Sequence, residues 1–490
     1  MSAFDDLMAF QRDTEALSQI AGRLGWDQET MMPRASADQR GEEMAAIEGV
    51  LHARRTDQRV ADWLARAQAP DATGAANLRH IARSHARATR VPGRLASELA
   101  RVTSLSQGIW ASARTANDVA GFLPTFKTVL ALKREQAAAL ADGGDPYDAL
   151  LDDHEPGATG QGLADMFGAL RPRLVALRER LLGAAHQPAG LSGTYHEAGQ
   201  MAVSETLARS FGYDMTRGRI DKAVHPFSSG SGNDVRITTR TNPVDPFNCF
   251  YSTIHEVGHA AYEQGIDQKH LLTPLGQGVS MGVHESQSRI YENQLGRSAP
   301  FTAHLFGLMR DTFGDFGVPD AAAFHGAVNR VTSGYIRTEA DEVHYNLHVL
   351  LRFDLERLLI SGALAPEDLE EAWNARFLAD FGVAVDKPAN GLLQDVHWPV
   401  GLFGYFPTYT LGNVYAGCLN HALRVAIPDL DDDLAAGNSA PATGWLRSNI
   451  QTHGGLRPPR ATIEHACGFD PHEGPLLDYL EAKFTALYRL

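Results

Sequence analysis

Residues 248–265 run Asn-Cys-Phe-Tyr-Ser-Thr-Ile-His-Glu-Val-Gly-His-Ala-Ala-Tyr-Glu-Gln-Gly, and they contain the pattern His-Glu-x-x-His at 255–259. On a helix, residues four apart lie one above the other on the same face, so His255 and His259 can bind one metal ion. Glu256 lies about 100° around the helix from His255, away from the metal's ligands but near a water molecule in the open position. The pattern is therefore typical of a hydrolytic zinc site.

The segment around this motif carries the signals of a helix with defined ends. Asp245 suits the N-cap, Pro246 suits the first helical position, and Gly265 can end the helix. The segment also has a broad apolar surface, formed by Phe247, Phe250, Tyr251, Ile254, Val257, Gly258 and Ala261. We therefore expect a buried helix, which would make a rigid metal platform.

Two histidines leave a catalytic zinc ion one protein ligand short, and a carboxylate from a second helix can supply it. Glu285 follows His259 by 285 − 259 = 26 residues, which allows a helix, a loop and a return helix packed against the first. We expect Glu285 to be the third ligand. Glu263 and Glu292 are competing candidates, better suited to contacts behind the ligands or at the surface.

Composition narrows the class of protein. Hydrophobic residues make up 44% and charged residues 21% of the 490 positions, as in ordinary globular proteins. The formal net charge is −15, and without a basic stripe it argues against binding to nucleic acid or to an anionic membrane. The start of the chain lacks the features of a signal peptide, and the three cysteines are scattered. We expect a cytoplasmic protein.

Most of the chain has helical residue spacing. We find no linker or internal repeat, so we expect a single domain over 1–490, with a helical cover and scaffold in about 1–215 and the catalytic part in about 216–490. Between 217 and 240 the period changes to that of two or three short strands, a small sheet directly before the metal helix. Helices are predicted near 5–24, 36–54, 57–68, 75–90, 93–142, 160–186, 197–211, 320–331, 339–360, 366–381, 408–426, 442–453 and 472–489.

Five segments, in order, resemble the signatures of the carboxypeptidase Taq family of zinc metallocarboxypeptidases. They are Asp234-Val-Arg-Ile-Thr238, His255-Glu-Val-Gly-His259, His284-Glu-Ser-Gln287, Ile336-Arg-Thr-Glu-Ala-Asp341 and Gly391-Leu-Leu-Gln-Asp-Val-His-Trp398. Thinner support comes from 26–33 and 147–157, where His154 stands in place of an expected tyrosine.

This resemblance implies a mainly α-helical fold, similar to neurolysin and angiotensin-converting enzyme, with a deep active-site groove and a helical cover. It implies a zinc ion in each chain, although cobalt and manganese stay alternatives for the native metal. It also implies a homodimer that hydrolyses peptide bonds and releases C-terminal amino acids with broad specificity. The substrate would be a peptide with a free C-terminal carboxylate.

Several side chains are candidates for the chemistry. Glu256 would take a proton from the attacking water and give it to the departing amine. The oxyanion needs a hydrogen-bond donor besides the metal, and Tyr405, Tyr409 and His397 are the candidates. All three lie in or near a loop rich in Gly, Pro and aromatic residues, as functional loops often are. Their alternative role is aromatic packing beside Trp398.

A free C-terminal carboxylate is best bound by a guanidinium group, which donates two parallel hydrogen bonds. Arg337 is the first candidate and Arg236 the second. An ion pair between Arg337 and Asp341, one helical turn apart, is the structural alternative. Asp234 and Thr238, on the same predicted strand as Arg236, either position the substrate or stabilise the sheet.

Two other functions stay open at this point. An endo-oligopeptidase would use the same zinc chemistry without binding the C-terminus, and its activity on amidated peptides would distinguish it. A catalytically silent helical protein could keep the metal, although an intact Glu256 argues against that. The partners that orient the ligating imidazoles do not follow from spacing alone, and Asp341, Glu342 and Asp395 are candidates.

Overall fold

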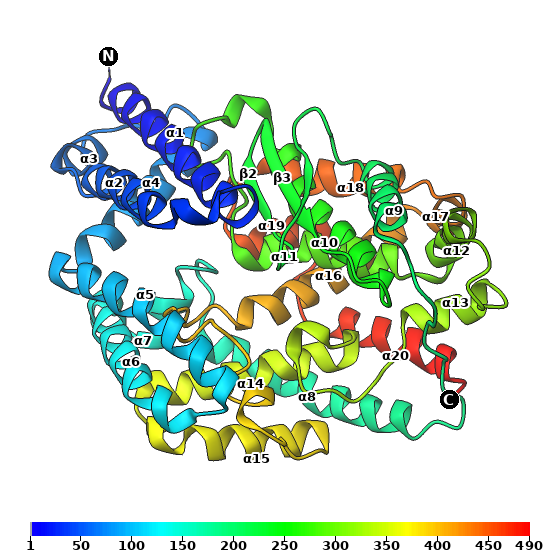
Figure 1. Cartoon of the computed structure of the whole chain (residues 1–490). Coiled ribbons are helices and arrows are strands. Elements are labelled where there is room, and N and C mark those ends of the chain that lie inside the picture. The colour runs from blue at the N-terminus through cyan, green and yellow to red at the C-terminus, as the bar shows by residue number, and fades with distance from the viewer. Residues whose placement is uncertain (1) are drawn as a thin grey trace. The chain divides into compact units, whose positions relative to one another are not determined.

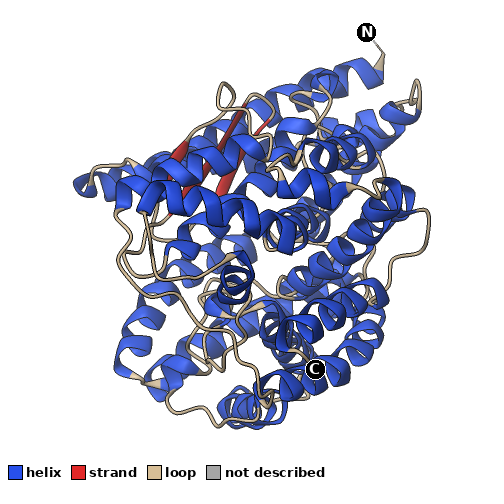
Figure 2. Ribbon diagram, turned by 90° about the vertical axis from the view of Figure 1, so that its right-hand side faces the viewer, coloured by secondary structure: helices blue, strands red, loops and turns tan. Residues whose placement is uncertain are grey.

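The computed structural model describes residues 2–490, and almost all of the regular structure is helical (Figures 1 and 2). The mainly α fold with one small sheet is therefore confirmed. None of the described helices is both long and apolar enough to cross a membrane. Two compact units divide the chain. The first comprises residues up to Thr89, Ala189–Val328 and Tyr415–Pro471, and the second comprises Arg90–Pro188, Asn329–Val414 and His472–Leu490.

The first unit holds the sheet and the helices around it. A short π-helical segment, Ile290–Gly296, continues the helix that carries Glu285. The α-helices of this unit are α1 (Ala3–Thr30), α2 (Ala37–Arg55), α3 (Gln58–Leu64), α4 (Ala72–Arg90), α9 (Glu197–Ser210), α10 (Pro246–Gly265), α11 (Met281–Arg289), α12 (Ala299–Phe313), α13 (Ala321–Val328), α17 (Leu430–Ala435), α18 (Ala440–Asn449) and α19 (Pro459–Cys467).

The sheet consists of β1 (Ile220–Lys222), β2 (Ser228–Ser231) and β3 (Asp234–Thr239) in the order β1-β3-β2. The central strand β3 pairs in parallel with β1 and antiparallel with β2. Helix α10 packs against β3 and β2, and α1 contacts β2. The predicted sheet next to the metal helix is therefore present, and α1 lies beside its β2 edge (Figure 1).

Helix α10 begins and ends where the sequence predicts. The Asp245 side chain accepts a hydrogen bond from the backbone N–H of Phe247, and Pro246 occupies the first turn. Most of the helix is buried, including Phe250, Ile254 and Val257, which are fully enclosed. Each such side chain contributes about 1.5–3 kcal/mol by leaving water, so α10 is firmly fixed in the first unit.

The second unit is built around α14, a largely buried helix. The ring of Phe353 in α14 contacts the rings of Tyr147 and Phe167 edge-on. The α-helices of this unit are α5 (Gly93–Ala116), α6 (Val119–Ala141), α7 (Pro146–Leu151), α8 (Gly160–Leu182), α14 (Glu342–Ser361), α15 (Leu369–Phe381) and α20 (Gly474–Tyr488), while α16 (Pro407–Ala426) contributes residues to both units.

One helical boundary escaped the sequence analysis. The continuous helical segment expected over 93–142 is in fact α5 and α6, which pack side by side. Asn117 ends α5 in the left-handed conformation, with φ of 55°, a conformation that asparagine tolerates better than most residues. Asp118 then caps α6 by accepting a hydrogen bond from the N–H of Gly121. The turn occupies only two residues of ordinary composition, so residue spacing did not reveal it.

A buried carboxylate connects α14 to the aromatic loop that the sequence singled out. Glu356 accepts hydrogen bonds from the Tyr147 hydroxyl (2.9 Å), the Trp398 indole N–H (2.8 Å) and the Gly404 backbone N–H (3.1 Å). Burial raises the pKa of Glu356 to about 7, although these three donors oppose the shift. The carboxylate therefore fixes the start of the segment that leads to Tyr405.

This environment predicts a pH dependence of stability. A raised pKa in the folded state stabilises the fold below the ordinary value of 4.5, and this stabilisation is lost as pH rises towards 7. Replacing Glu356 with glutamine removes the titration. We expect the unfolding free energy of the wild type, relative to Glu356→Gln, to fall by up to about 3 kcal/mol between pH 4.5 and 7. Denaturant unfolding of both proteins measures this, and a difference that does not change with pH would refute it.

Candidate active site

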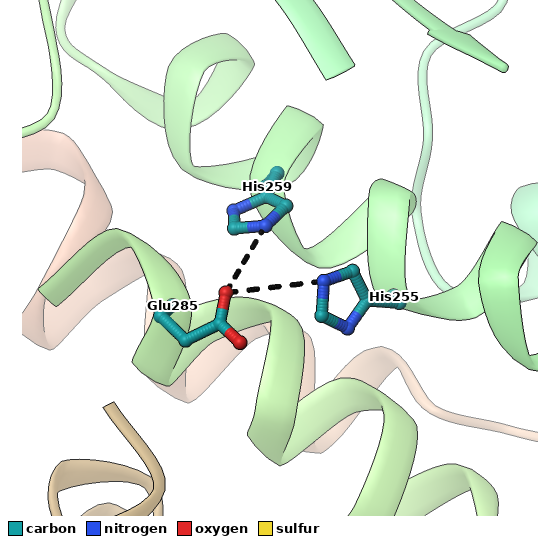
Figure 3. Close-up of side chains that lie close together, drawn as sticks. All are labelled: His255, His259 and Glu285. Atoms are coloured by element: carbon teal, nitrogen blue, oxygen red, sulfur yellow. Dashed lines mark ion pairs between the residues drawn. The ribbon is translucent and has the colours of Figure 1, made fainter. Parts of the chain in front are cut away.

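The two histidines of α10 and Glu285 of α11 lie together in the first unit (Figure 3). The Oε2 atom of Glu285 is 3.5 Å from Nε2 of His259 and 3.9 Å from Nε2 of His255. One potential ligand atom from each residue lies within 4.8 Å of the other two. The 26-residue separation therefore brings the predicted carboxylate to the histidine pair.

This donor set fits a divalent metal ion. In a tetrahedral site with metal–ligand distances of about 2.1 Å, neighbouring ligand atoms lie roughly 3.4 Å apart, close to the separations between Glu285 and the two imidazoles. Burial lowers the pKa of His259 to about 3, so its ring is neutral and offers a lone pair. Two imidazoles and one carboxylate leave a fourth position open for water or substrate.

The surroundings of Glu285 keep its carboxylate charged. Its Oε1 atom accepts a hydrogen bond from Nε of Arg289 (2.6 Å), and its Oε2 atom, which faces the histidines, accepts one from Ser288 (3.2 Å). Burial alone would raise the pKa of Glu285, but the positive charge of Arg289 outweighs it and keeps the pKa below its usual range. The carboxylate is thus ionised and orientated before any metal binds.

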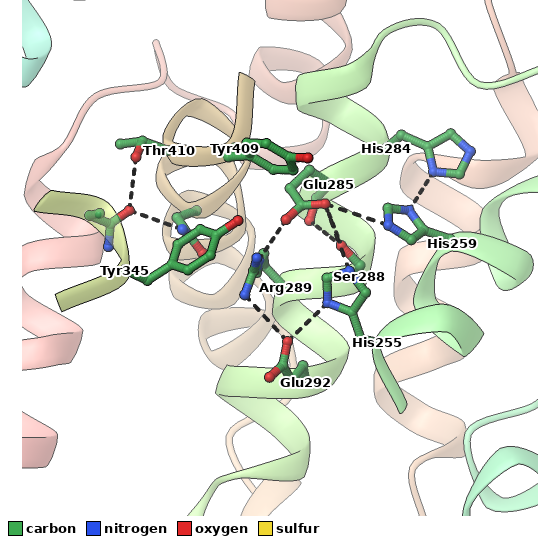
Figure 4. A network of polar contacts seen from close by, with 12 residues as sticks. His255, His259, His284, Glu285, Ser288, Arg289, Glu292, Tyr345, Tyr409 and Thr410 are labelled. Atoms are coloured by element: carbon green, nitrogen blue, oxygen red, sulfur yellow. Dashed lines mark hydrogen bonds and ion pairs between the residues drawn. The ribbon is translucent and has the colours of Figure 1, made fainter. Parts of the chain in front are cut away.

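Glu292, an alternative candidate for the third ligand, contacts the Nδ1 atom of His255 instead of joining the metal-binding group. Its Oε2 atom lies 2.9 Å from Nδ1 of His255 and also binds Arg289 (Figure 4). Arg297 binds the other oxygen of this carboxylate. Since Nδ1 of His255 is occupied in this way, its Nε2 remains for the metal. The π-helical segment that follows α11 carries Glu292 to this position.

Glu263, the other alternative, binds His284 rather than the histidine pair. Its Oε1 atom is 2.9 Å from Nε2 of His284, and Nδ1 of His284 is 2.7 Å from Nδ1 of His259. The carboxylates that the sequence analysis considered for orienting the imidazoles are engaged elsewhere: Asp341 pairs with His344, Glu342 with Lys483, and Asp395 with Arg337 and Arg352. The side chains that contact the outer ring nitrogens of His255 and His259 are instead Glu292 and His284.

Glu256 directly follows His255 in the chain and is almost completely buried, with 6% of its surface exposed. Burial raises the pKa of Glu256 to about 7. A carboxylate in this range can both accept and donate a proton near neutral pH, as a general base that later acts as an acid requires.

The candidate oxyanion donors lie in the second unit. The Tyr409 hydroxyl is 3.2 Å from Nε2 of His397, and the ring of Tyr405 contacts the ring of Tyr409 edge-on. Burial lowers the pKa of His397 to about 3, with Arg337 acting in the same direction, so its ring is neutral. His154, which replaces an expected tyrosine, still makes an aromatic contact with Tyr405.

Arg337, also in the second unit, is buried among charged and aromatic groups. Its Nε and Nη2 atoms donate to one oxygen of Asp395 (3.1 and 3.0 Å), and Nη1 donates to the Tyr345 hydroxyl (3.2 Å). Arg352 binds the other oxygen of Asp395 at 2.7 Å. The expected alternative, an ion pair between Arg337 and Asp341, does not form, because Asp341 caps α14 and pairs with His344.

Arg236, Asp234 and Thr238 lie on β3 in the first unit. Arg236 donates two hydrogen bonds to Asp234, which also pairs with Arg23 of α1, and the Arg236 guanidinium lies over the ring of Trp26. The Thr238 hydroxyl is fully buried and accepts a hydrogen bond from the N–H of Phe227. These contacts join β3 to its neighbours, which favours a structural role for Thr238.

Comparison with known proteins decides the family. A family model described as carboxypeptidase Taq (M32) metallopeptidase matches residues 6–484. The chain belongs to this family. Thermostable carboxypeptidase 1 of Thermus thermophilus is 42% identical, with 99% of each chain covered. Two solved structures are similar over almost their full length: the M32 carboxypeptidase of Deinococcus radiodurans (TM-score 0.96, 37% identity, 100% of both chains) and metallocarboxypeptidase 1 of Trypanosoma cruzi (TM-score 0.95, 31% identity, 98% of this chain and 99% of the other).

As a member of the M32 family, the chain is a metallocarboxypeptidase, an enzyme that hydrolyses peptide bonds with a metal cofactor. The histidine pair, its carboxylate and a place for Glu292 behind the ligands were predicted from the sequence, whereas the contacts of Arg289 and His284 were not. The available signal was a charged or imidazole side chain close to Glu285 in sequence, four residues after it for Arg289 and directly before it for His284. Choosing between such residues required knowing which side of α11 faces α10.

The packing of α10 against α11 explains why position 258 in the His-Glu-x-x-His motif is a glycine, which was not predicted from the sequence. A Cβ atom at this position would lie 2.6 Å from the carbonyl oxygen of Gln287 and 2.6 Å from Cα of Ser288, both in the backbone of α11. The absence of a side chain therefore lets α10 and α11 approach closely enough for Glu285 to face the histidines.

We expect Gly258→Ala to push α11 away from α10 and to weaken metal binding in the M32 enzyme. Overpacking of this kind costs about 1–3 kcal/mol of stability. Zinc affinity and thermal unfolding of the metal-free protein measure the two effects. Gly307→Ala on α12 is a matched control, because a Cβ there meets open space. Unchanged zinc affinity in Gly258→Ala would contradict this account of the crossing.

Proposed function

We propose that the chain is a zinc carboxypeptidase whose metal is bound by His255, His259 and Glu285. The observation that carries this proposal is the convergence of two imidazole nitrogens and one ionised carboxylate oxygen within 4.8 Å of one another, a donor set that suits a tetrahedral zinc ion. Nitrogen and carboxylate ligands of this kind suit zinc, with cobalt or manganese as substitutes. Metal analysis of the purified protein tests the assignment, with one zinc ion expected per chain.

Within this reaction, Glu256 is the proton-transfer group. When bound, zinc would polarise the scissile carbonyl and lower the pKa of water. Glu256 accepts a proton from the attacking water and delivers it to the departing amine. Its buried position supports this role, because a carboxylate with a pKa of about 7 holds the proton between the two steps.

Tyr409 is the first candidate to donate a hydrogen bond to the oxyanion, with Tyr405 and His397 as alternatives. The hydrogen bond between Tyr409 and the neutral ring of His397 supports this order, because it orients the hydroxyl. His397 then acts through Tyr409. Tyr405 lies in ring contact with both residues.

Arg337 is the first candidate to bind the C-terminal carboxylate of the peptide, and Arg236 is the second. Asp395 is shared by two buried guanidinium groups, so the cluster of Arg337, Arg352 and Asp395 keeps one excess positive charge. A buried excess charge attracts an anionic group such as a peptide carboxylate. Arg236 also shares its partner, Asp234, with another arginine, Arg23, but these side chains are partly exposed, which favours Arg337. Asp234 is proposed to keep Arg236 in place, and Thr238 to stabilise the sheet.

For Arg337→Ala we expect a higher KM and a loss of roughly 10- to 100-fold in kcat/KM on free-acid peptides, because charged hydrogen bonds to the carboxylate disappear. Steady-state kinetics with free-acid and amidated forms of one peptide measure this. Arg236→Ala is the matched control and should have a smaller effect. An unchanged preference of Arg337→Ala for the free acid would move the assignment to Arg236.

An endo-oligopeptidase with the same zinc site is the competing function. Mass spectrometry of products from a short peptide separates the two: an exopeptidase removes single residues from the C-terminus and spares the amidated form. The carboxypeptidases of the family support the exopeptidase outcome.

We further propose that the enzyme has broad specificity, forms a homodimer, is located in the cytoplasm and consists of a single catalytic domain over 1–490. The free state of all three cysteines is consistent with a reducing compartment.

A further inference from the structure

His284 of α11 lies between the proposed ligand His259 and the buried carboxylate of Glu263. Nδ1 of His284 is 2.7 Å from Nδ1 of His259 (Figure 4), and Nε2 of His284 is 2.9 Å from Oε1 of Glu263. His259 and Glu263 are one turn apart on α10, so one imidazole from α11 connects two residues of the neighbouring helix. The ring of His284 also contacts the ring of Tyr262.

The direction of these hydrogen bonds follows from the role of His259. If Nε2 of His259 offers its lone pair to a metal, its Nδ1 carries the hydrogen and donates it to Nδ1 of His284. His284 must then carry its own hydrogen on Nε2, where it donates to Glu263. The Glu263 carboxylate also accepts a hydrogen bond from the backbone N–H of Gly278 at 2.9 Å, which fixes its position.

The loop around Gly278 restricts the positions of the His284 and Glu263 side chains. A Cβ atom at Gly278 would lie 2.6 Å from Cδ2 of His284 and 3.3 Å from Oε1 of Glu263, so the loop presses directly against both groups. Glu263 is itself buried. The loop at Gly278 therefore restrains both His284 and Glu263.

The two ligand histidines are oriented in different ways. His255 binds the carboxylate of Glu292 directly, whereas His259 reaches a carboxylate only through a second imidazole. We propose that His284 and Glu263 are positioning residues that hold the ring of His259 in the orientation required for metal binding. This inference rests on the proposed role of His259 as a ligand. Removing such a partner usually costs about 10- to 100-fold in metal affinity.

The test compares zinc dissociation constants, measured by competition with a chelator on the metal-free full-length protein. For His284→Ala we expect zinc affinity about 10- to 100-fold weaker than in the wild type. His284→Asn should recover most of this loss, because the amide oxygen lies near the position of Nδ1 and accepts from His259. Glu263→Ala should weaken binding, and Glu263→Gln less so, since its amide oxygen still accepts from His284.

His344→Ala is the matched control, because it removes another histidine that pairs with a carboxylate, Asp341, at 2.8 Å in the second unit. It should change thermal stability but leave zinc affinity unchanged. The visible spectrum of the cobalt-loaded protein gives a second readout, and His284→Ala should alter it. A protein whose only defect is reduced stability would keep the wild-type spectrum.

The His259→Ala variant distinguishes a failure of the positioning role from a failure of the metal site itself. If His259→Ala abolishes zinc binding but His284→Ala and Glu263→Ala bind zinc within about threefold of the wild type, the positioning role is overturned and the metal site stands. If His259→Ala itself retains wild-type affinity, the proposed metal site fails. Should His284→Ala not fold, Glu263→Ala and His284→Asn decide the question by the same measurement.

Discussion

Replacing Glu256 with glutamine is expected to lower kcat by about 10²–10⁴-fold on a free-acid peptide, with the metal still bound. Glutamine has nearly the same shape but cannot accept a proton from water or deliver one to the leaving amine. Because Glu256 is not one of the three residues whose ligand atoms lie together, its neutralisation should not remove the metal. Steady-state kinetics and metal analysis of the same preparation measure the two quantities.

The metal content of Glu256→Gln determines how its loss of turnover is interpreted. A large loss of turnover with one metal ion per chain supports proton transfer by Glu256, whereas a loss of both turnover and metal points to a defect of the site itself. Glu256→Asp is a useful companion, because it keeps the charge but withdraws the carboxylate by one methylene group. Wild-type turnover by Glu256→Gln would refute the assigned role.

The second large effect is expected for Tyr409→Phe, which should reduce kcat by about 10²–10³-fold while changing KM little. A donor to the oxyanion acts mainly in the transition state, so its loss appears in kcat rather than in substrate binding. The phenylalanine ring preserves the aromatic contacts of Tyr409 with Tyr405 and Phe406 and removes only the hydroxyl that binds His397.

Tyr405→Phe is the matched control for this prediction, since it removes the neighbouring hydroxyl from the same aromatic cluster. We expect a smaller loss of kcat in Tyr405→Phe than in Tyr409→Phe. If the order is reversed, Tyr405 is the donor. If both variants turn over like the wild type, neither hydroxyl stabilises the oxyanion and the assignment of this cluster is wrong.

Much of the fold and the metal group followed from local signals. The ends of α10 depend on Asp245, Pro246 and Gly265, whose effects act within one turn of the chain, so the helix was predicted almost to the residue. The histidine pair followed from helical geometry. Glu285 followed from the number of ligands that zinc requires and from a separation that fits two packed helices.

The surroundings of the site did not follow from the sequence, because they depend on contacts between distant segments. Asp395 lies 58 residues from Arg337 along the chain, and nothing local indicated that it pairs with this arginine rather than with a metal ligand. Likewise, the π-helical turn that brings Glu292 to His255 has no strong sequence signal. The break at Asn117 was missed because a left-handed asparagine resembles any other polar helix residue in sequence.

The central claim is that His255, His259 and Glu285 bind the metal that the M32 enzyme uses. Anomalous X-ray diffraction at the zinc absorption edge, from crystals of the metal-loaded protein, tests it most directly. The account predicts one strong peak about 2.0–2.2 Å from Nε2 of both histidines and from a carboxylate oxygen of Glu285. A peak bound by other residues, or a zinc ion that Glu285 does not contact, would contradict it.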